Sequence, residues 1–186
     1  CAVYIQENYA QSYNISEYGN SFPEFLSRKY PSLSFLEELA EFELIFRDLF
    51  HQKYEIFTPD FSQISSPDIV LQFNNNSRIL KFNSPVYTFW KNRDEENFSL
   101  ASVDLAENEY IIIYKSIKVL TDQLEDHTIY VKRLSLPEFK LMDKLVNGQR
   151  IAAALENIEE TSITEEQIRD LFYFIKDSGI IAGIKG

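Results

Sequence analysis

Residues 34 to 57 carry the strongest periodic signal in the chain. Their apolar side chains recur mostly at spacings of three and four, which places them along one side of an α-helix. The residues concerned are Phe35, Leu36, Leu39, Phe42, Phe46, Leu49, Phe50 and Phe57. A stripe of this width has to be buried against other elements, so the pattern predicts a long helix within a folded core.

Another helix signal lies upstream of this segment. Ser21 offers an N-cap, and Pro23 and Glu24 follow at positions where an early proline and an acidic residue favour a helix start. Tyr30 and Pro31 then end that helix, because the residue before a proline is biased away from the helical conformation. We therefore expect residues 1 to 57 to be largely helical.

A strand pattern follows in the middle of the chain. Residues 69 to 73 and 78 to 82 form two alternating apolar runs, and an Asn-Asn-Asn-Ser turn separates them. This pattern is typical of a β-hairpin. The aromatic segment at 85 to 90 fits either a strand or a short helical turn. The polar residues 91 to 97 then mark a boundary between two units.

We accordingly predict an α+β protein with two domains. Residues 1 to 97 form a helical lobe with a small β-hairpin, and residues 98 to 186 form a winged-helix-like unit. In this second unit, β-branched and aromatic runs predict three strands, at 110 to 114, 117 to 120 and 128 to 134. Three helices follow, at 137 to 146, 149 to 158 and from 164 to the break at Gly179, with a short strand at 180 to 184.

The stretch MDKLVNGQRIAAALENI, residues 142 to 158, has the order of a helix-turn-helix, with an Asn-Gly break between two apolar helices. A DNA-binding protein needs a surplus of Lys and Arg on at least one face. The formal net charge is instead −11. Residues 1 to 103 carry 8 basic against 14 acidic side chains, and residues 104 to 186 carry 10 against 15. We therefore expect no nucleic-acid partner.

Catalytic and metal-binding motifs are scarce. The chain has one Cys, at position 1, and two His, at 51 and 127, which cannot supply an internal disulfide or a four-ligand structural zinc site of thiolates and imidazoles. No Gly-rich phosphate loop and no G-x-S-x-G nucleophile motif is present. No apolar run approaches the length of a membrane helix. The sequence therefore favours a non-enzymatic protein without a membrane partner.

Four segments resemble the HvfC/BufC family, long labelled a putative DNA-binding domain. They are YGNSFPEFL at 18 to 26, FLEELAEFE at 35 to 43, PVYTFW at 85 to 90 and FKLMDKLVNGQRIAAAL at 139 to 155. They occur in the family's order over nearly the whole chain. Two departures are the absence of the usual His-Pro before the middle strands and Phe42 in place of the commoner Leu.

The resemblance implies a partner protein. Members of the family accompany a TIM-barrel, multinuclear non-haem iron oxygenase that modifies cysteines of a ribosomally made precursor peptide. Short and divergent sequences of this kind resemble the methanobactin biosynthesis branch typified by MbnC, whose partner MbnB takes part in oxazolone and thioamide formation. The resemblance thus implies a cytoplasmic subunit with no cofactor of its own, iron in the partner enzyme, and a winged helix that captures the leader peptide.

A physical mechanism agrees with this implication. An exposed edge strand can pair with an extended peptide, and a neighbouring helix can receive its side chains. The third predicted strand is the candidate edge, and the third helix is the candidate groove wall. The candidate peptide-binding residues are Thr128, Ile129, Tyr130, Val131, Lys132, Arg133, Leu171, Phe172 and Ile175. The alternative for the three helix residues is that they fill the core.

Two further expectations remain open. Phe89 and Trp90 are candidates for the interface with the oxygenase, although they equally fit a packing role between the two lobes. The acidic net charge suits a Lys-rich leader peptide, which it would attract over a distance. The competing function is a transcription regulator that uses the helix pair at 137 to 158.

Overall fold

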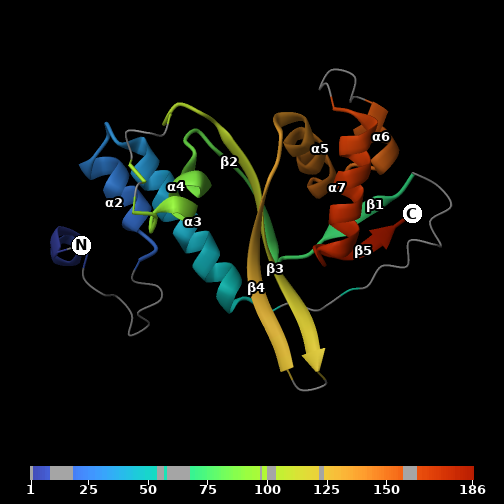
Figure 1. The fold of residues 1–186 in the computed structure, drawn as a ribbon, viewed down its shortest axis with the longest axis horizontal. Coiled ribbons are helices and arrows are strands. Elements are labelled where there is room, and N and C mark those ends of the chain that lie inside the picture. Colours follow the sequence, from blue (N-terminus) through green and yellow to red (C-terminus); the bar gives the residue numbers. More distant parts are fainter. Residues whose placement is uncertain are drawn as a thin grey trace. The chain divides into compact units, whose positions relative to one another are not determined.

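The computed structural model describes residues 2–8, 19–53, 57, 68–96, 98–99, 104–121, 124–156 and 163–186 (Figure 1). The chain clusters into two compact units, which are described separately. The first unit comprises Cys1–Asp48 and Phe82–Glu109, and the second comprises Leu49–Lys81 and Tyr110–Gly186. The boundary predicted at residues 97 and 98 falls within the first of these units.

The first unit is helical. Its helices are α1 (Ala2–Glu7), α2 (Phe22–Lys29), α4 (Val86–Asn92) and most of α3 (Ser34–His51), whose last three residues, from Leu49 on, belong to the second unit. The predicted long helix is therefore confirmed as α3, which ends at His51; residues 54 to 56 of the predicted span lie outside the described part of the chain. Of the aromatic segment at 85 to 90, Pro85 is the N-cap and residues 86 to 90 belong to the helix α4, which was one of the two predicted alternatives.

Aromatic rings form the core of the first unit. Phe42 on α3 is fully buried. The rings of Phe46, Phe82, Tyr87 and Trp90 have their centroids 5.4 to 6.4 Å from that of Phe42. Edge-on and tilted contacts at this range stabilise aromatic pairs beyond the burial of their area. Three residues of the periodic stripe, Phe35, Phe42 and Phe46, thus pack on aromatic rings of α4, whereas Phe50 at the end of the stripe is exposed.

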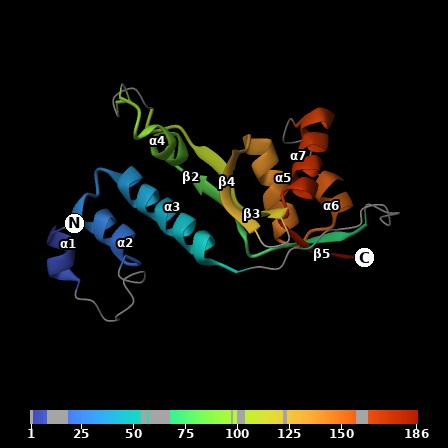
Figure 2. The ribbon, with the colours of Figure 1, turned by 60° about the horizontal axis from the view of Figure 1, so that its bottom comes forward.

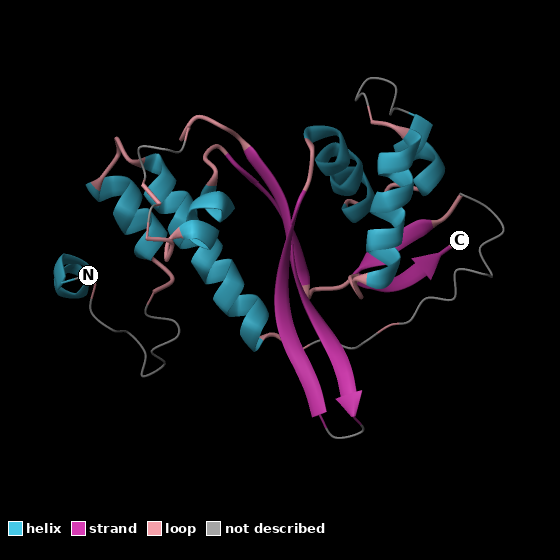
Figure 3. Cartoon of the chain, viewed as in Figure 1, coloured by secondary structure: helices cyan, strands magenta, loops and turns pink. Residues whose placement is uncertain are grey.

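The strands form two small sheets, shown in magenta in Figure 3. The larger has the order β2-β3-β4, and the smaller pairs β1 with β5 in antiparallel fashion. Their bounds are β1 (Val70–Phe73), β2 (Ser77–Phe82), β3 (Glu109–Thr121), β4 (Leu124–Arg133) and β5 (Ile181–Lys185). The overall class is therefore α+β, as predicted.

The predicted hairpin of residues 69 to 73 and 78 to 82 is wrong, because its two strands belong to different sheets. At the turn, the Asn74 N–H donates to the Ile180 carbonyl, while the Asn76 carbonyl accepts from the Lys115 N–H. Each strand therefore pairs with a segment far away in the sequence, which the local Asn-rich turn did not indicate.

The predicted strands at 110 to 114 and 117 to 120 are also not separate, since both lie within β3. Lys115 and Ser116, which appeared to divide them, continue the antiparallel register opposite Ile129 and Thr128. The predicted third strand is confirmed as β4, the other arm of a long hairpin. The three-stranded sheet takes its remaining strand, β2, from upstream in the chain.

Three helices follow β4, as predicted, and the starts of two of them have a local cause. They are α5 (Leu136–Val146), α6 (Ile151–Glu156) and α7 (Glu165–Asp177). Ser135 and Glu138 form a capping box at α5, and Thr164 and Gln167 form one at α7. Residues 157 and 158 of the predicted second helix lie outside the described residues. Helices α5 and α7 lie side by side (Figure 1, Figure 2).

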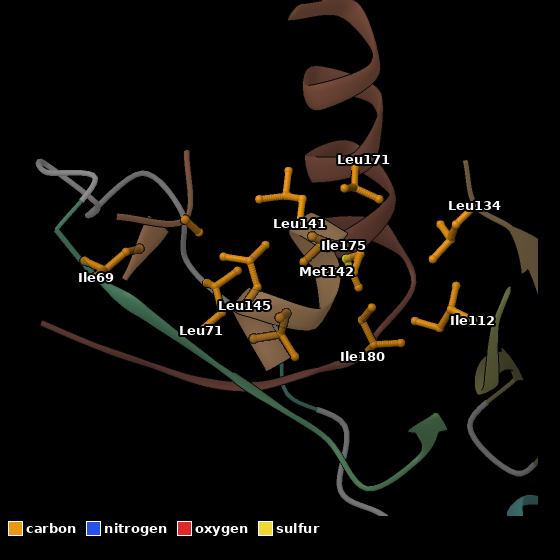
Figure 4. Close-up of a cluster of buried hydrophobic side chains, with 12 residues drawn as sticks. Ile69, Leu71, Ile112, Leu134, Leu141, Met142, Leu145, Leu171, Ile175 and Ile180 are labelled. Atoms are coloured by element: carbon orange, nitrogen blue, oxygen red, sulfur yellow. The ribbon is translucent and has the colours of Figure 1, made fainter. Parts of the chain in front are cut away.

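An aliphatic core holds the second unit together (Figure 4). It gathers side chains from α5, α7 and the strands, and Leu145, Leu171 and Ile180 are fully buried in it. Gly179, at φ +73°, turns the chain from α7 into β5 in the left-handed conformation that favours glycine. Among the described helices, none combines the length and apolar composition needed to cross a membrane.

Candidate functional site

β4 is an edge strand of the three-stranded sheet. It pairs with β3 on one side, and no strand of the described residues pairs with it on the other. The Leu134 N–H donates to the Tyr110 carbonyl. Because the direction of backbone groups alternates along an antiparallel strand, those of Ile129 and Val131 point away from β3. The Lys115 N–H, opposite Ile129, agrees with this alternation because it points away from β4, to Asn76.

The two faces of β4 have different surroundings. Tyr130 lies opposite Tyr114, and Lys132 lies opposite Ile112. Side chains of directly opposed residues share one face of a sheet. Since Ile112 and Tyr114 belong to or pack against the aliphatic core, this is the face that meets the helices. Ile129 and Val131 therefore have their side chains on the other face.

An aromatic cluster lies where this face meets α7. The rings of Tyr114 and Tyr130 stack with centroids 5.5 Å apart, and Phe174 meets Tyr114 edge-on at 5.3 Å. All three residues are half-buried. We call Tyr114, Tyr130 and Phe174 the sheet-edge aromatic cluster. It joins the edge strand to α7, so a ligand that pairs with β4 would lie beside it.

One cation accompanies this cluster. The Lys132 ammonium lies over the Phe174 ring, 5.4 Å from its centroid, within the range of a cation–π contact. Burial raises the pKa of the Tyr114 phenol above its ordinary value, and neighbouring Tyr130 raises this pKa further. Tyr114 therefore stays uncharged at neutral pH, and Lys132 supplies the positive charge beside the rings.

The structure separates the predicted peptide-binding residues into two groups. Those of β4, Thr128 to Lys132, are half-buried along the edge strand, and Arg133 is exposed. Leu171 and Ile175 are almost completely buried and point into the aliphatic core (Figure 4). These two residues fill the core, which was the alternative prediction, and cannot line an accessible groove. Phe172 is half-buried and packs against the same core.

Sequence reasoning missed Tyr114 and Phe174. Phe174 lies one position before Ile175, so it faces about 100° away from that core residue on the helix. This offset turns it towards the sheet, where it meets Tyr114. Tyr114 was recognised as part of a strand, but its pairing with Tyr130 depends on the register. The available signal was the high aromatic content of both segments.

Phe89 and Trp90, the predicted partner interface, pack inside the first unit. Phe89 contacts Phe35 and Phe98 at ring distances of 5.8 and 5.3 Å. Trp90 packs on the rings around Phe42, and the Arg93 guanidinium lies 4.3 Å from its ring centroid. Both aromatic residues remain half-buried, so any interface with a partner would involve only their outer edges.

Two buried charged groups have structural partners. The Glu109 carboxylate accepts from the Tyr87 N–H at 2.6 Å and from the Thr88 hydroxyl at 2.9 Å, at the start of α4. The Lys115 ammonium donates to the carbonyls of Phe50 and Gln52, at 2.7 and 3.0 Å, at the end of α3. Charge-assisted hydrogen bonds of this kind offset the cost of burying a charge. These two groups therefore fix helix ends.

The exposed surface of α7 is acidic. Four carboxylates and two cations are exposed along it: Glu165, Glu166, Asp170, Asp177, Arg169 and Lys176. In a helix-turn-helix the second helix of the pair enters the major groove, and nearby cations contact the phosphates. In the predicted pair this helix is α6, whose sequence IAAALE contains no Lys or Arg. Neither α6 nor the acidic surface of α7 therefore favours DNA binding. Within the described ranges, no three His, Cys, Asp or Glu side chains come together as metal ligands would.

Comparison with known proteins gives a partial similarity only. No known protein family and no solved structure matches the chain. The exonuclease/helicase protein RexA of Lactococcus lactis subsp. cremoris strain MG1363 is 30% identical over 127 residues, and so is an ATP-dependent helicase/nuclease protein of strain SK11. The alignment covers 63% of this chain and 10% of either relative. The chain thus spans about a tenth of the length of the curated relatives it matches.

Proposed function

We propose that this chain is a non-catalytic subunit that binds an extended peptide by strand addition to β4. The single observation that carries the proposal is the edge strand beside α7, with the backbone groups of Ile129 and Val131 directed outwards. A peptide paired with β4 gains main-chain hydrogen bonds and places alternate side chains against the helix face.

The arrangement of the second unit supports a winged-helix-like interpretation of this site. The β2-β3-β4 sheet precedes three helices, and α7 packs on the face of β3 through the contact of Phe174 with Tyr114. The small second sheet belongs to the same unit: β1 pairs with β5, and Val70 bridges to Arg150 just before α6. A three-stranded sheet with three helices after its last strand is expected of a leader-peptide-binding winged helix; along the chain, α4 separates β2 from β3.

The resemblance to the HvfC/BufC family supplies the partner in this proposal. The bound peptide is the leader of a ribosomally made precursor, and its cysteines are presented to a TIM-barrel iron oxygenase of the MbnB kind. Iron and oxygen chemistry belong to that partner, and this chain contributes binding and orientation. In this proposal the first unit contacts the oxygenase, through the outer edges of α4.

The competing proposal is nucleic-acid binding through the helix pair at 137 to 158. Its support is the helix-turn-helix order, together with the similarity to a helicase/nuclease protein. Against it stand the net charge of −11 and the absence of Lys and Arg from α6, the second helix of the pair. A protein with this charge repels the phosphate backbone unless a basic face compensates. Peptide binding is therefore the proposal that the site favours.

The test compares two substitutions at one residue of β4. Val131→Pro removes an outward N–H without removing a β3 ladder bond, and proline is tolerated at such edge positions. Val131→Ala keeps the N–H and serves as the matched control. We expect the proline variant to bind the precursor peptide encoded beside the gene about tenfold more weakly, as expected for the loss of one interstrand hydrogen bond and a steric clash. The alanine variant should bind nearly as well as the wild type.

Two further measurements complete the test: amide hydrogen exchange with bound peptide, and binding of promoter DNA. Bound peptide should slow amide exchange at Ile129 and Val131, and co-expression with the neighbouring TIM-barrel protein should give a stable complex. Equal peptide affinity in both variants, with no protection of β4, would exclude strand addition. Salt-sensitive binding of promoter DNA by a chain that forms no protein complex would instead favour the competing function.

A further inference from the structure

Lys132 differs from Lys115 in what surrounds its ammonium group. Its side chain is half-buried, and its ammonium rests on the Phe174 ring. Within the described residues, no carboxylate lies within salt-bridge distance of this ammonium. Lys115, on the opposite face of the sheet, donates instead to two carbonyls. Lys132 therefore keeps hydrogen-bond donors available on the face that meets α7.

The register decides what a strand added to β4 would place beside this ammonium. Directly opposed residues of an antiparallel pair have Cβ atoms about 4.5 to 5.5 Å apart, on the same face. One peptide side chain would therefore lie beside Lys132. Because side chains alternate between faces, the peptide residue two positions away would lie beside Tyr130. The positions beside Lys132 and Tyr130 therefore bind two side chains of the same peptide segment.

We propose that Lys132 and the sheet-edge aromatic cluster form a specificity element for an acidic-x-aromatic peptide segment. This inference rests on the proposed function. A carboxylate, from Asp or Glu, pairs with the Lys132 ammonium, and an aromatic or large apolar side chain packs on Tyr130. A strand antiparallel to β4 carries the order Asp-x-Phe, whereas a parallel strand carries Phe-x-Asp. The element fixes the register of the peptide as well as its composition.

The negative net charge of the protein does not oppose this selection. Surface charges act on an approaching peptide through water and are screened over about 8 Å at physiological ionic strength. They affect how fast a peptide arrives. Lys132 contacts the bound peptide directly. At its half-buried position salt screens the electrostatic interaction less, so Lys132 affects which peptide side chain is bound most tightly. A precursor that is basic overall can still carry one carboxylate at this position.

The test uses synthetic fluorescein-labelled peptides of about twelve residues, long enough to cover β4, with a Thr-rich background. Their central segments are Asp-Thr-Phe, Asn-Thr-Phe and Lys-Thr-Phe, together with the reversed orders. Binding is measured by fluorescence anisotropy with the full chain and with Lys132→Glu. The control variant is Lys140→Glu, which makes the same charge change at an exposed lysine on α5.

We expect the wild type to bind an Asp peptide about fivefold more tightly than its Asn counterpart, as a cross-strand ion pair would give. Lys132→Glu should reverse the preference in favour of the Lys peptide, and Lys140→Glu should keep the wild-type preference. A charge preference that survives Lys132→Glu, or is altered equally by Lys140→Glu, overturns the inference. Failure of the Asp peptides to bind the wild type also overturns it.

The failure of this inference can be distinguished from that of strand addition. If the precursor peptide protects the amides of Ile129 and Val131 while the charge swap has no effect, only the specificity element is wrong. If no peptide protects these amides and Val131→Pro changes nothing, strand addition itself is wrong. The charge swap therefore tests the contact of Lys132 with the peptide, and amide protection tests strand addition to β4.

Discussion

The two units use their aromatic residues differently. In the first unit, rings surround the fully buried Phe42 and form the core itself. In the second, the core is aliphatic, and the rings of Tyr114, Tyr130 and Phe174 lie half-buried at the edge of a sheet. A ring inside a core contributes to stability alone, while a half-buried ring that packs on a core beside an open strand edge also offers part of its surface to a ligand. The difference therefore separates structural from candidate binding residues.

The charged groups differ in their partners: Glu38, Glu109 and Lys115 are held by hydrogen bonds within their own units, whereas Lys132 rests on an aromatic ring. Glu109 in the first unit is buried against hydrogen-bond donors of α4, and Glu38 of α3 accepts from the backbone and side chain of Asn83. Both hold elements of that unit together. Lys132 in the second unit rests on a ring, with no carboxylate beside it among the described residues. The aromatic residues and the charged residue therefore both indicate the edge of β4 as the candidate binding site.

The largest effect should come from opening the aromatic core. Phe42→Ala removes the ring that the others surround, and a fully buried Phe truncated in this way costs about 3–5 kcal/mol of the free energy of unfolding. Phe50→Ala, at an exposed position of the same helix, should cost less than about 1 kcal/mol. Urea denaturation measures both. Similar losses in the two variants would mean that Phe42 is not the centre of the core.

A second substitution tests the assignment of Leu171 to the aliphatic core. Leu171→Ala should lower the free energy of unfolding by about 2–5 kcal/mol, because a cavity remains in packed surroundings. Tyr173→Ala, on the exposed face of the same helix, should lower it by less than about 1 kcal/mol. If Leu171→Ala left stability unchanged but weakened peptide binding, Leu171 would line a groove as the sequence first indicated.

Neutralising the Glu109 carboxylate, which accepts hydrogen bonds from α4, should cause a smaller loss in the free energy of unfolding. Glu109→Gln leaves one oxygen to accept hydrogen bonds where two now accept from Tyr87 and Thr88. Loss of a hydrogen bond to a charged group costs about 1–3 kcal/mol. Glu107→Gln makes the same change at an exposed position and should be nearly neutral. Thermal unfolding of the two variants side by side gives the comparison.

The smallest expected change in the free energy of unfolding concerns three acidic residues on α3, Glu37, Glu38 and Glu41. Glu41 is exposed, but neighbouring atoms desolvate it in part; this desolvation raises its pKa above the ordinary value of 4.5, and the charges of Glu37 and Glu38 raise the pKa further. A raised folded-state pKa adds stability below the ordinary value, and this stability is lost as the pH rises through the folded-state pKa. Glu41→Gln should therefore stabilise the protein at pH 7, by about 0.2–0.5 kcal/mol, as for a relieved like-charge helix pair.

The pH dependence gives this prediction its check. The gain should disappear well below pH 4.5, where the wild-type carboxyl is protonated and resembles the amide. Glu43→Gln, on the same helix but not three or four residues from Glu37 or Glu38, should give a smaller gain. A gain from Glu41→Gln that stays constant between pH 3 and pH 7 would rule out charge as its cause.

The sequence alone determined the elements whose signals are local. The periodic stripe predicted α3, and the residues that form capping boxes, Ser135 with Glu138 and Thr164 with Gln167, mark helix starts that were predicted to within one residue. The strand β4, with its candidate binding residues, was also identified from its composition. Caps, turns and periodicity act between residues a few positions apart, so they can be read without the fold.

Only the tertiary structure decided which strands pair and which faces are open. The strands β1 and β2 are neighbours in the sequence but belong to different sheets, because each has a better partner more than twenty-five residues away. On α7, periodicity could not tell that Leu171 faces the core while Phe174 faces the sheet. Both outcomes depend on contacts between residues that are far apart in the sequence. The free energy of such a contact depends on both residues, so a pattern within one segment cannot predict it.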